Sequence, residues 1–353
     1  MSKISFFLNT LLFLYVLIAG NPVQAQELKP WSFNVYLEND LFADTDINYT
    51  NGIRFSGISP DLNSFTDEQG QPYPWIENLN TAFDFLYPSS DFGDEVLISR
   101  NIVITLGQLM FTPTDREATQ VLENERPYAG WLYLGVGYHA RSEKRLHSAE
   151  INLGVIGPAS LARESQNLIH RIRDIDLFQG WHNQLKNEPG IQLIYEEKLK
   201  HFKTEIDATQ IEIDLISHWG GSLGNVATYL NGGAELRLGY NLPNDFGTST
   251  LRPGGDNHSP GFAQEESQPF RLYGFAATDA RLVLQNIFLD GNTFRNSHQV
   301  DKKHFVSDLS LGITSTWKKW TLSYAHVWRS KEFNSQNNSQ FYGSLSLSYK
   351  RSF

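Results

Sequence analysis

Two polar clusters near the start of the chain carry the residue types that bind a hard cation. The first is Glu38-Asn39-Asp40, and the second lies in Tyr49-Thr50-Asn51-Gly52. Carboxylate, amide, hydroxyl and backbone carbonyl oxygens are the ligands that Ca²⁺ prefers. These clusters indicate a candidate calcium site that includes Asn39, Asp40 and Thr50. The alternative is an ordinary Asn/Asp/Gly loop that is held by side chain-to-backbone turns.

His170 is the best candidate for a general base, because histidine changes its charge near neutral pH. It follows Gln166 by four residues, so in a helix both side chains lie on one face. The alternative is a histidine that only packs within a loop. The chain has no His-Glu-x-x-His motif and no glycine-rich phosphate loop after a strand. We therefore expect chemistry by water that a base activates, without a covalent serine.

Strands are the elements that must position these groups. Apolar and polar residues alternate in 31–38, 53–56, 101–106, 131–138, 149–155, 191–196, 211–216 and 234–240, less regularly in 269–278, 304–317 and 319–330, and again in 341–353. Alternate side chains of a strand point to opposite faces, as a wall between lipid and water requires. The pattern predicts an all-β, transmembrane antiparallel β-barrel of about twelve strands. The alternative for the last segment is a strand of a soluble β-sandwich.

The connections divide by length. If the N-terminus starts in the periplasm, most long connections lie outside the cell and most tight turns inside, as outer-membrane barrels have them. Segments 59–98 and 241–268 are long but fall on the inner side, where they fold over a rim or contain an unrecognised hairpin. Segment 160–173 has helical spacing with Ser160 as N-cap. An apolar stripe of Leu161, Leu168, Ile169 and Ile172 predicts that this helix packs against the barrel wall.

Composition agrees with an exported membrane protein. Residues 1–25 read as a signal peptide, which leaves 26–353 as a single barrel domain. Aromatic residues make up 13% of the chain, which suits the aromatic girdles of a barrel, and there are no cysteines. The net charge of −10 argues against nucleic acid as a partner.

The motifs resemble those of the outer-membrane lipid A 3′-O-deacylases, the LpxR family. The resemblance covers 38–189 and rests on ordered motifs: Glu38-Asn39-Asp40, Tyr49-Thr50-Asn51-Gly52-x-Arg54-x-Ser56, Gln108-x-Met110-Phe111-Thr112-Pro113, Arg126-Pro127-Tyr128-Ala129-Gly130-Trp131, Gly157-Pro158, Gln166-Asn-x-x-His170 and Gly180-Trp181-x-x-Gln184-Leu185-x-x-Glu188-Pro189. Glu125 stands where the family pattern would have Asp, which keeps the acidic character. The second half of the chain matches only in barrel character.

The resemblance implies an outer-membrane, calcium-dependent esterase that acts on lipid A or lipopolysaccharide. Its site would lie between the barrel wall and a helix from an outer loop. It also implies roles for residues: His170 as the base, Asn39 and Asp40 in the catalytic and calcium site, and Gln166 beside them. Further candidate members of the site are Thr50, Arg54, Ser56 and an acidic residue among Asp174, Asp176 and Glu188. The alternatives are an outer-membrane channel without chemistry and an outer-membrane phospholipase.

Overall fold

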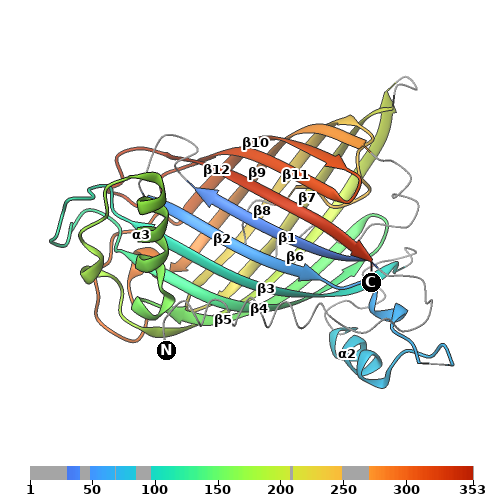
Figure 1. Cartoon of the computed structure of the whole chain (residues 1–353), viewed down its shortest axis with the longest axis horizontal. Helices are drawn as coiled ribbons and strands as arrows, with labels where there is room; N and C mark the ends of the chain where they lie inside the picture. Colours follow the sequence, from blue (N-terminus) through green and yellow to red (C-terminus); the bar gives the residue numbers. More distant parts are fainter. Residues whose placement is uncertain are drawn as a thin grey trace.

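Twelve antiparallel strands close into one barrel in the computed structural model, which describes residues 30–39, 48–67, 69–84, 97–206, 210–248 and 270–352. Each strand pairs with its sequence neighbours, and β1 pairs with β12 to close the barrel (Figure 1). The predicted fold and strand number are confirmed. The strands are β1 (Pro30–Asn39), β2 (Asn48–Ile58), β3 (Ser99–Thr112), β4 (Ala129–Arg141), β5 (Arg145–Ile156), β6 (Glu188–Ile206), β7 (Ile211–Gly224), β8 (Ala227–Tyr240), β9 (Phe270–Asn286), β10 (Phe305–Trp317), β11 (Trp320–Arg329) and β12 (Gln340–Ser352).

Alternation along the strands sorts side chains between the outside and the lumen. In β4, Leu134 and Val136 are exposed on the outside, whereas Tyr133, which directly precedes Leu134, is buried in the lumen. In β12, Leu347 is exposed and its neighbour Ser346 is buried. The barrel thus has an apolar exterior and a polar interior, as a wall in lipid needs. None of the helices in the described ranges is long and apolar enough to cross a membrane.

Long connections interlock at the end of the barrel that carries α3 (Ala162–Arg173), which we call the α3 end. The Leu185 N–H donates to the carbonyl of Tyr128 at 2.9 Å, and the Ser335 hydroxyl donates to the carbonyl of Asn124 at 2.6 Å. A ring nitrogen of His298 lies 2.8 Å from the carbonyl oxygen of Glu125. The connections 113–128, 157–187, 287–304 and 330–339 therefore form one cap.

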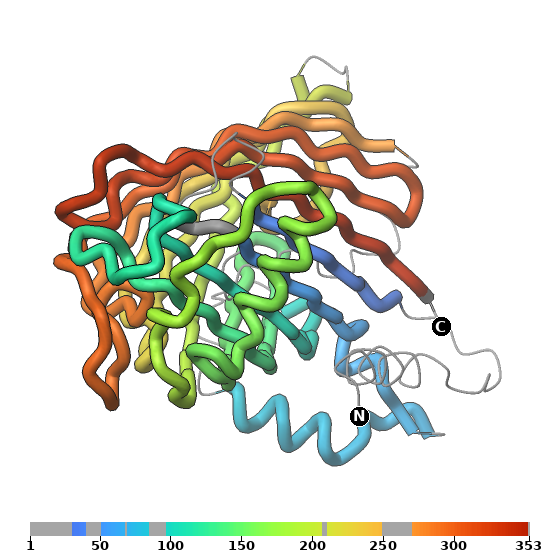
Figure 2. The backbone as a smooth tube through the Cα atoms, turned by 60° about the vertical axis from the view of Figure 1, so that its left-hand side comes forward, coloured from blue at the N-terminus to red at the C-terminus, as the bar shows by residue number. Residues whose placement is uncertain are grey.

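The two long connections at the opposite end, which we call the α2 end, lie on different sides of the wall. Segment 59–84 lies on the outer surface and contains α2 (Pro74–Asp84), which the sequence pattern did not predict (Figure 2). Phe83 of α2 stacks on Tyr138 of β4 with ring centroids 4.3 Å apart. Segment 241–248 instead enters the lumen, where buried Phe246 lies under the cations of Arg141 and Lys200. Residues 68, 85–96 and 249–268 and the expected signal peptide lie outside the described residues.

Candidate active site

A row of paired residues that includes two asparagines crosses the outside of the barrel at the α3 end. Asn39 of β1 pairs with Asn51 of β2, Asn51 with Met110 of β3, and Met110 with Gly130 of β4. Asn39 and Asn51 occupy the outward parity of their strands, in line with exposed Val35 and Phe55 respectively. Both asparagines are nevertheless buried, 7% and 3% exposed.

Helix α3 begins in direct contact with the wall at Gly130. A Cβ on Gly130 would lie 2.3 Å from Cβ of Ala162, so only glycine permits this approach. The amide of Gln108 in β3 also donates to the carbonyl of Ser160 at 2.6 Å. Ser160 belongs to the 3-10 turn η3 (Pro158–Ser160), and the N-cap of α3 is Leu161 in the left-handed region. The predicted helix is confirmed, but Ser160 as its N-cap is wrong.

The helix packs on the wall through its polar face. Ala162, Gln166 and His170, each four residues apart, are buried. Leu168 and Ile172 of the predicted apolar stripe are 60% and 75% exposed. Packing against the wall is therefore confirmed, but the apolar stripe is not the surface that makes it.

The geometry carries His170 toward the two asparagines. Figure 1 shows α3 lying across the ends of the strands, and the contact at Gly130 fixes its first turn over β4. From Ala162 to His170 the helix rises about 12 Å, at 1.5 Å per residue. Adjacent strands are about 4.8 Å apart, so this rise covers between two and three strand spacings. Starting from β4, His170 thus reaches the region of Asn51 and Asn39.

A backbone hydrogen bond orients His170. Its Nδ1 lies 2.7 Å from the carbonyl oxygen of Asp176, which can only accept, so Nδ1 carries the hydrogen in the neutral ring. The lone pair of the neutral imidazole is then on Nε2. Phe178 packs edge-on against the ring, with centroids 5.8 Å apart. Of the three acidic candidates near His170, Asp176 thus contacts it through its backbone.

Aromatic side chains close the space beside the helix. Trp181, in the 3-10 turn η4 (Trp181–Asn183), donates its Nε1–H to Oε1 of Gln166 at 2.7 Å. Tyr128 packs on Trp181 with ring centroids 5.1 Å apart. Burial raises the pKa of the Tyr128 phenol to about 12. Gln166 and His170 are therefore shielded from solvent on this side by aromatic rings.

The cation ligands expected from the sequence are brought together only in part. Asp40 lies outside the described residues. Thr50 is the extra residue at a register shift of β2 against β3, a bulge of the kind that often re-aims residues beside active sites, and its side chain is not described. Asn51, which we did not single out, adds a buried amide oxygen for which the described residues offer no hydrogen-bond donor.

This set of oxygen donors fits a hard cation. Asn39 and Asn51 would supply neutral oxygens, as Ca²⁺ accepts, and a carboxylate such as Asp40 would supply charge. In the described part of the chain, no three His, Cys, Asp or Glu side chains gather where they could hold a metal.

Three further predicted members lie elsewhere. Arg54 points into the lumen, where it is paired with Glu150 of β5 at 3.1 Å. Ser56 also faces the lumen and accepts from the amide of Asn34 at 3.2 Å. Glu188 accepts the backbone N–H groups of Thr293 and Phe294, so it holds the connection 287–304. The contacts of these residues are those of structural groups.

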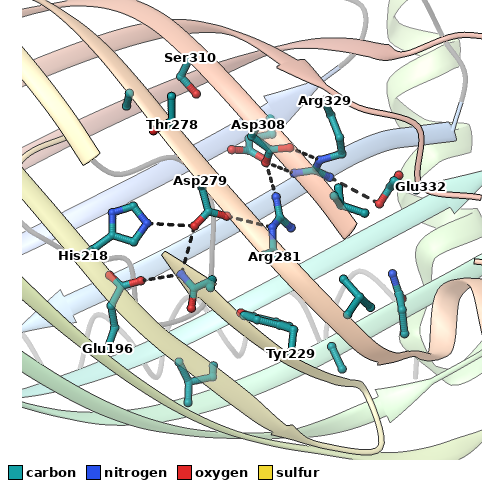
Figure 3. A pocket seen from close by; sticks show the side chains of 18 of the residues that line it. Glu196, His218, Tyr229, Thr278, Asp279, Arg281, Asp308, Ser310, Arg329 and Glu332 are labelled. Carbon is teal, nitrogen blue, oxygen red and sulfur yellow. Dashed lines mark hydrogen bonds and ion pairs between the residues drawn. The ribbon is translucent and has the colours of Figure 1, made fainter. Parts of the chain in front are cut away.

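The lumen contains a cavity rich in charge, which is a second place to look for chemistry. Figure 3 shows Asp279 and Asp308 turned toward Arg281. Asp308 also accepts from Arg329 at 2.9 Å, and His218 lies 2.9 Å from Asp279. Asp308 is paired with Arg281 of β9 and Arg329 of β11, and Asp279 is paired with Arg281 of its own strand. We therefore interpret the cluster as a structural network of ion pairs in the lumen.

One segment has the Gly-x-Ser-x-Gly spacing of a nucleophile elbow, Gly220–Gly224, although we expected no serine chemistry. It lies inside β7 instead of at the strand-to-helix turn that such an elbow requires. The hydroxyl of Ser222 donates to the carbonyl of Ala227 at 2.9 Å. This serine is thus held within the sheet and has no exposed turn from which to attack a substrate.

Comparison with known proteins agrees with this architecture. The chain aligns over 90% of its length with LpxR from Salmonella typhimurium, covering 99% of that chain, with a TM-score of 0.66 and 19% sequence identity. The β domain of the Bordetella autotransporter BrkA aligns over 93% of this chain and 100% of its own, with a TM-score of only 0.42 and 9% identity. No curated protein matches the sequence. The family model of outer membrane protein LpxR matches residues 11–351, and the chain therefore belongs to the LpxR family.

Proposed function

We propose that this protein hydrolyses the 3′-linked acyloxyacyl ester of lipid A, in lipopolysaccharide of the outer leaflet, with calcium bound near Asn39, Asp40 and Thr50 and with His170 as the base. Membership of the LpxR family supports a lipid A deacylase-like hydrolase of the outer membrane. One observation carries the finer proposal. The polar face of α3, with Gln166 and His170, is buried, and the helix packs on β4 and β3, next to the strands that carry the outward-facing Asn51 and Asn39.

The position of this polar surface suits a membrane lipid as substrate. A site in the lumen would require the lipid to leave the bilayer, whereas a site on the outer wall faces lipid directly. Polar groups on a lipid-facing wall are costly unless something satisfies them. The polar groups under α3 are therefore best explained by a functional role.

His170 has the arrangement that a base needs. Its Nδ1–H is held by the carbonyl of Asp176, so Nε2 is the atom that takes a proton from the attacking water. Such proton transfer typically contributes about 10²–10⁴-fold in rate. The same nitrogen then returns the proton to the departing sugar oxygen, which completes the hydrolysis.

Calcium, when bound, would supply positive charge beside the ester carbonyl and beside the phosphate groups of an anionic lipid. The chain has a net charge of −10, so a divalent cation also offsets the repulsion between protein and substrate. Asn39 and Asn51 lie opposite each other in the β1–β2 ladder and present amide oxygens from adjacent strands.

Mass spectrometry of lipid A, before and after incubation with the purified protein and calcium, tests the proposal. We expect loss of the 3′-linked acyloxyacyl group, no loss in the presence of EDTA, and no loss with His170→Ala. Full activity in EDTA or in His170→Ala would refute the mechanism. Parallel incubation with glycerophospholipid distinguishes a phospholipase, and planar-bilayer conductance without acyl release would favour a channel.

A further inference from the structure

The side-chain amide of Gln166 is held in one orientation by Trp181. Indole N–H groups only donate, so the Gln166 atom that lies 2.7 Å from Nε1 of Trp181 must be the carbonyl oxygen Oε1. This contact fixes which side of the amide carries the NH₂ group. Both residues are only 2% exposed, so solvent does not compete for the bond.

The NH₂ group of Gln166 is a buried donor without an acceptor. Among the residues that the structure describes, no oxygen lies within hydrogen-bond distance of its Nε2. A buried donor of this kind is costly to the fold, because the amide has lost its water and gained nothing in return. Such orphaned groups in a native protein call for a functional explanation.

The donor lies beside the proposed base. Gln166 precedes His170 by one helical turn on the buried face of α3, and both point toward the wall strands. On the wall, Asn51 of β2, which pairs with Met110 of β3, has a buried side-chain oxygen that also finds no partner within the described ranges. The space between helix and wall therefore offers a base and a fixed hydrogen-bond donor together.

We propose that Nε2 of Gln166 donates a hydrogen bond to the carbonyl oxygen of the scissile ester, and that Trp181 is the residue that positions this donor. The inference deepens the proposed function and rests on it for the identity of the ester. During attack by water the carbonyl oxygen gains negative charge, so a donor already aimed at it stabilises the transition state more than the bound substrate. One such donor is typically worth about 10²–10³-fold in kcat.

The substitution Gln166→Glu separates this role from a structural one. It keeps the shape and the acceptor for Trp181, but at neutral pH it replaces the NH₂ donor with a second acceptor. We expect kcat to fall by about 10²–10³-fold, with KM little changed. As pH falls and the carboxyl group takes up a proton, it can donate again. The ratio of variant to wild-type kcat should therefore rise toward acid pH, whereas Gln166→Leu should show no such rise.

The variant Trp181→Phe tests the positioning role. It removes the N–H and keeps an aromatic ring, so the amide is free to turn and kcat should fall by less than in Gln166→Glu. Trp75→Phe on α2 is the matched control, because Trp75 is 53% exposed and lies at the opposite end of the barrel. A kcat of Gln166→Glu equal to that of the wild type at neutral pH would overturn the inference.

Infrared spectroscopy gives a readout that needs no turnover. Lipid A labelled with ¹³C at its ester carbonyls is bound to the protein that carries His170→Ala. We expect the carbonyl band of one ester to move to lower frequency, and the shift to vanish when Gln166→Leu is added. Absence of the shift refutes the hydrogen bond even if acyl release supports the proposed function. A shift without acyl release by the wild type would keep the donor and refute the hydrolase.

Discussion

Gly130→Ala should disable the site by pushing the helix off the wall, with little change to the barrel. The added Cβ would lie 2.3 Å from Cβ of Ala162 and 2.2 Å from Oγ of Ser160. Neither neighbour yields easily, because alanine has no rotamer to change and the Ser160 hydroxyl is bonded to the carbonyl of Gly157 at 2.6 Å. Ordinary carbon–carbon contact begins at about 3.5 Å, so the start of α3 must retreat by about 1.2 Å.

A retreat of this size is large for catalysis and small for folding. Misplacing a catalytic group by about 1 Å can cost about 10²-fold in rate, or about 2.7 kcal/mol of transition-state stabilisation. Overpacking typically costs about 1–3 kcal/mol of stability, and here the strain falls on the connection that carries α3. We therefore expect kcat/KM for acyl release to fall about 100-fold, while the barrel keeps its heat-modifiable mobility on SDS gels.

Gly274→Ala is the matched control. Gly274 faces outward in β9, and a Cβ there would meet only the carbonyl oxygen of Gly312, at an ordinary 3.7 Å. This variant should keep wild-type activity and stability. Wild-type kcat/KM in Gly130→Ala would refute the reasoning, because the chemistry would then not depend on the distance between α3 and the wall.

Three further perturbations test other features. Because the chain has no cysteine, Leu168→Cys can carry a single environment-sensitive dye. In proteoliposomes its emission should shift to the blue, since exposed Leu168 faces lipid, whereas dye at Glu117→Cys in the cap should not shift. Arg54→Met should lower the free energy of unfolding in urea by about 3–5 kcal/mol, since Glu150 stays buried without its guanidinium partner, but leave kcat per folded molecule unchanged. Burial raises the pKa of Tyr128 to about 12, so the folded state holds this proton more tightly than the unfolded state. The stability from this burial is complete below about pH 10 and is lost between about pH 10 and 12, and Tyr128→Phe should remove that part of the pH profile of thermal unfolding.

The strands could be predicted because two solvents impose a strict period on them. Each strand of the wall meets lipid on one side and the lumen on the other, so its pattern survives even in the short run 53–56. Boundaries were less predictable. Strand β6 runs to Ile206, well past the alternating run 191–196, and contains a register shift between Lys200 and Phe202. Helix α2 lies in a segment rich in Pro and Gly, where local signals favour turns.

The sequence predicts which kinds of residues form the candidate site, but not which individual residues face it. Gln166 and His170 share the buried face of α3, and Asn39 lies on the outward side of β1, yet Arg54 and Ser56 of the motif that begins at Tyr49 point to the lumen. Parity would have separated them. Asn51 has the outward parity of Ile53 and Phe55, whereas Arg54 and Ser56 have the inward one. A polar residue on the outward parity of a barrel strand is the informative exception, and this signal would have found Asn51.

The reversed packing of α3 follows from the same argument about solvents. In water, an amphipathic helix buries its apolar stripe, and for this reason the stripe of Leu161, Leu168, Ile169 and Ile172 predicts packing on the wall. On the outside of a membrane barrel the surroundings are apolar, so burying that stripe gains little. The wall at this point carries Asn39 and Asn51, which need polar partners. Helix α3 therefore leaves Leu168 and Ile172 outside and turns Gln166 and His170 inward. The Gln166 amide nitrogen and the Asn51 side-chain oxygen still lack partners among the described residues, and these are the groups that the proposed substrate and cation would engage.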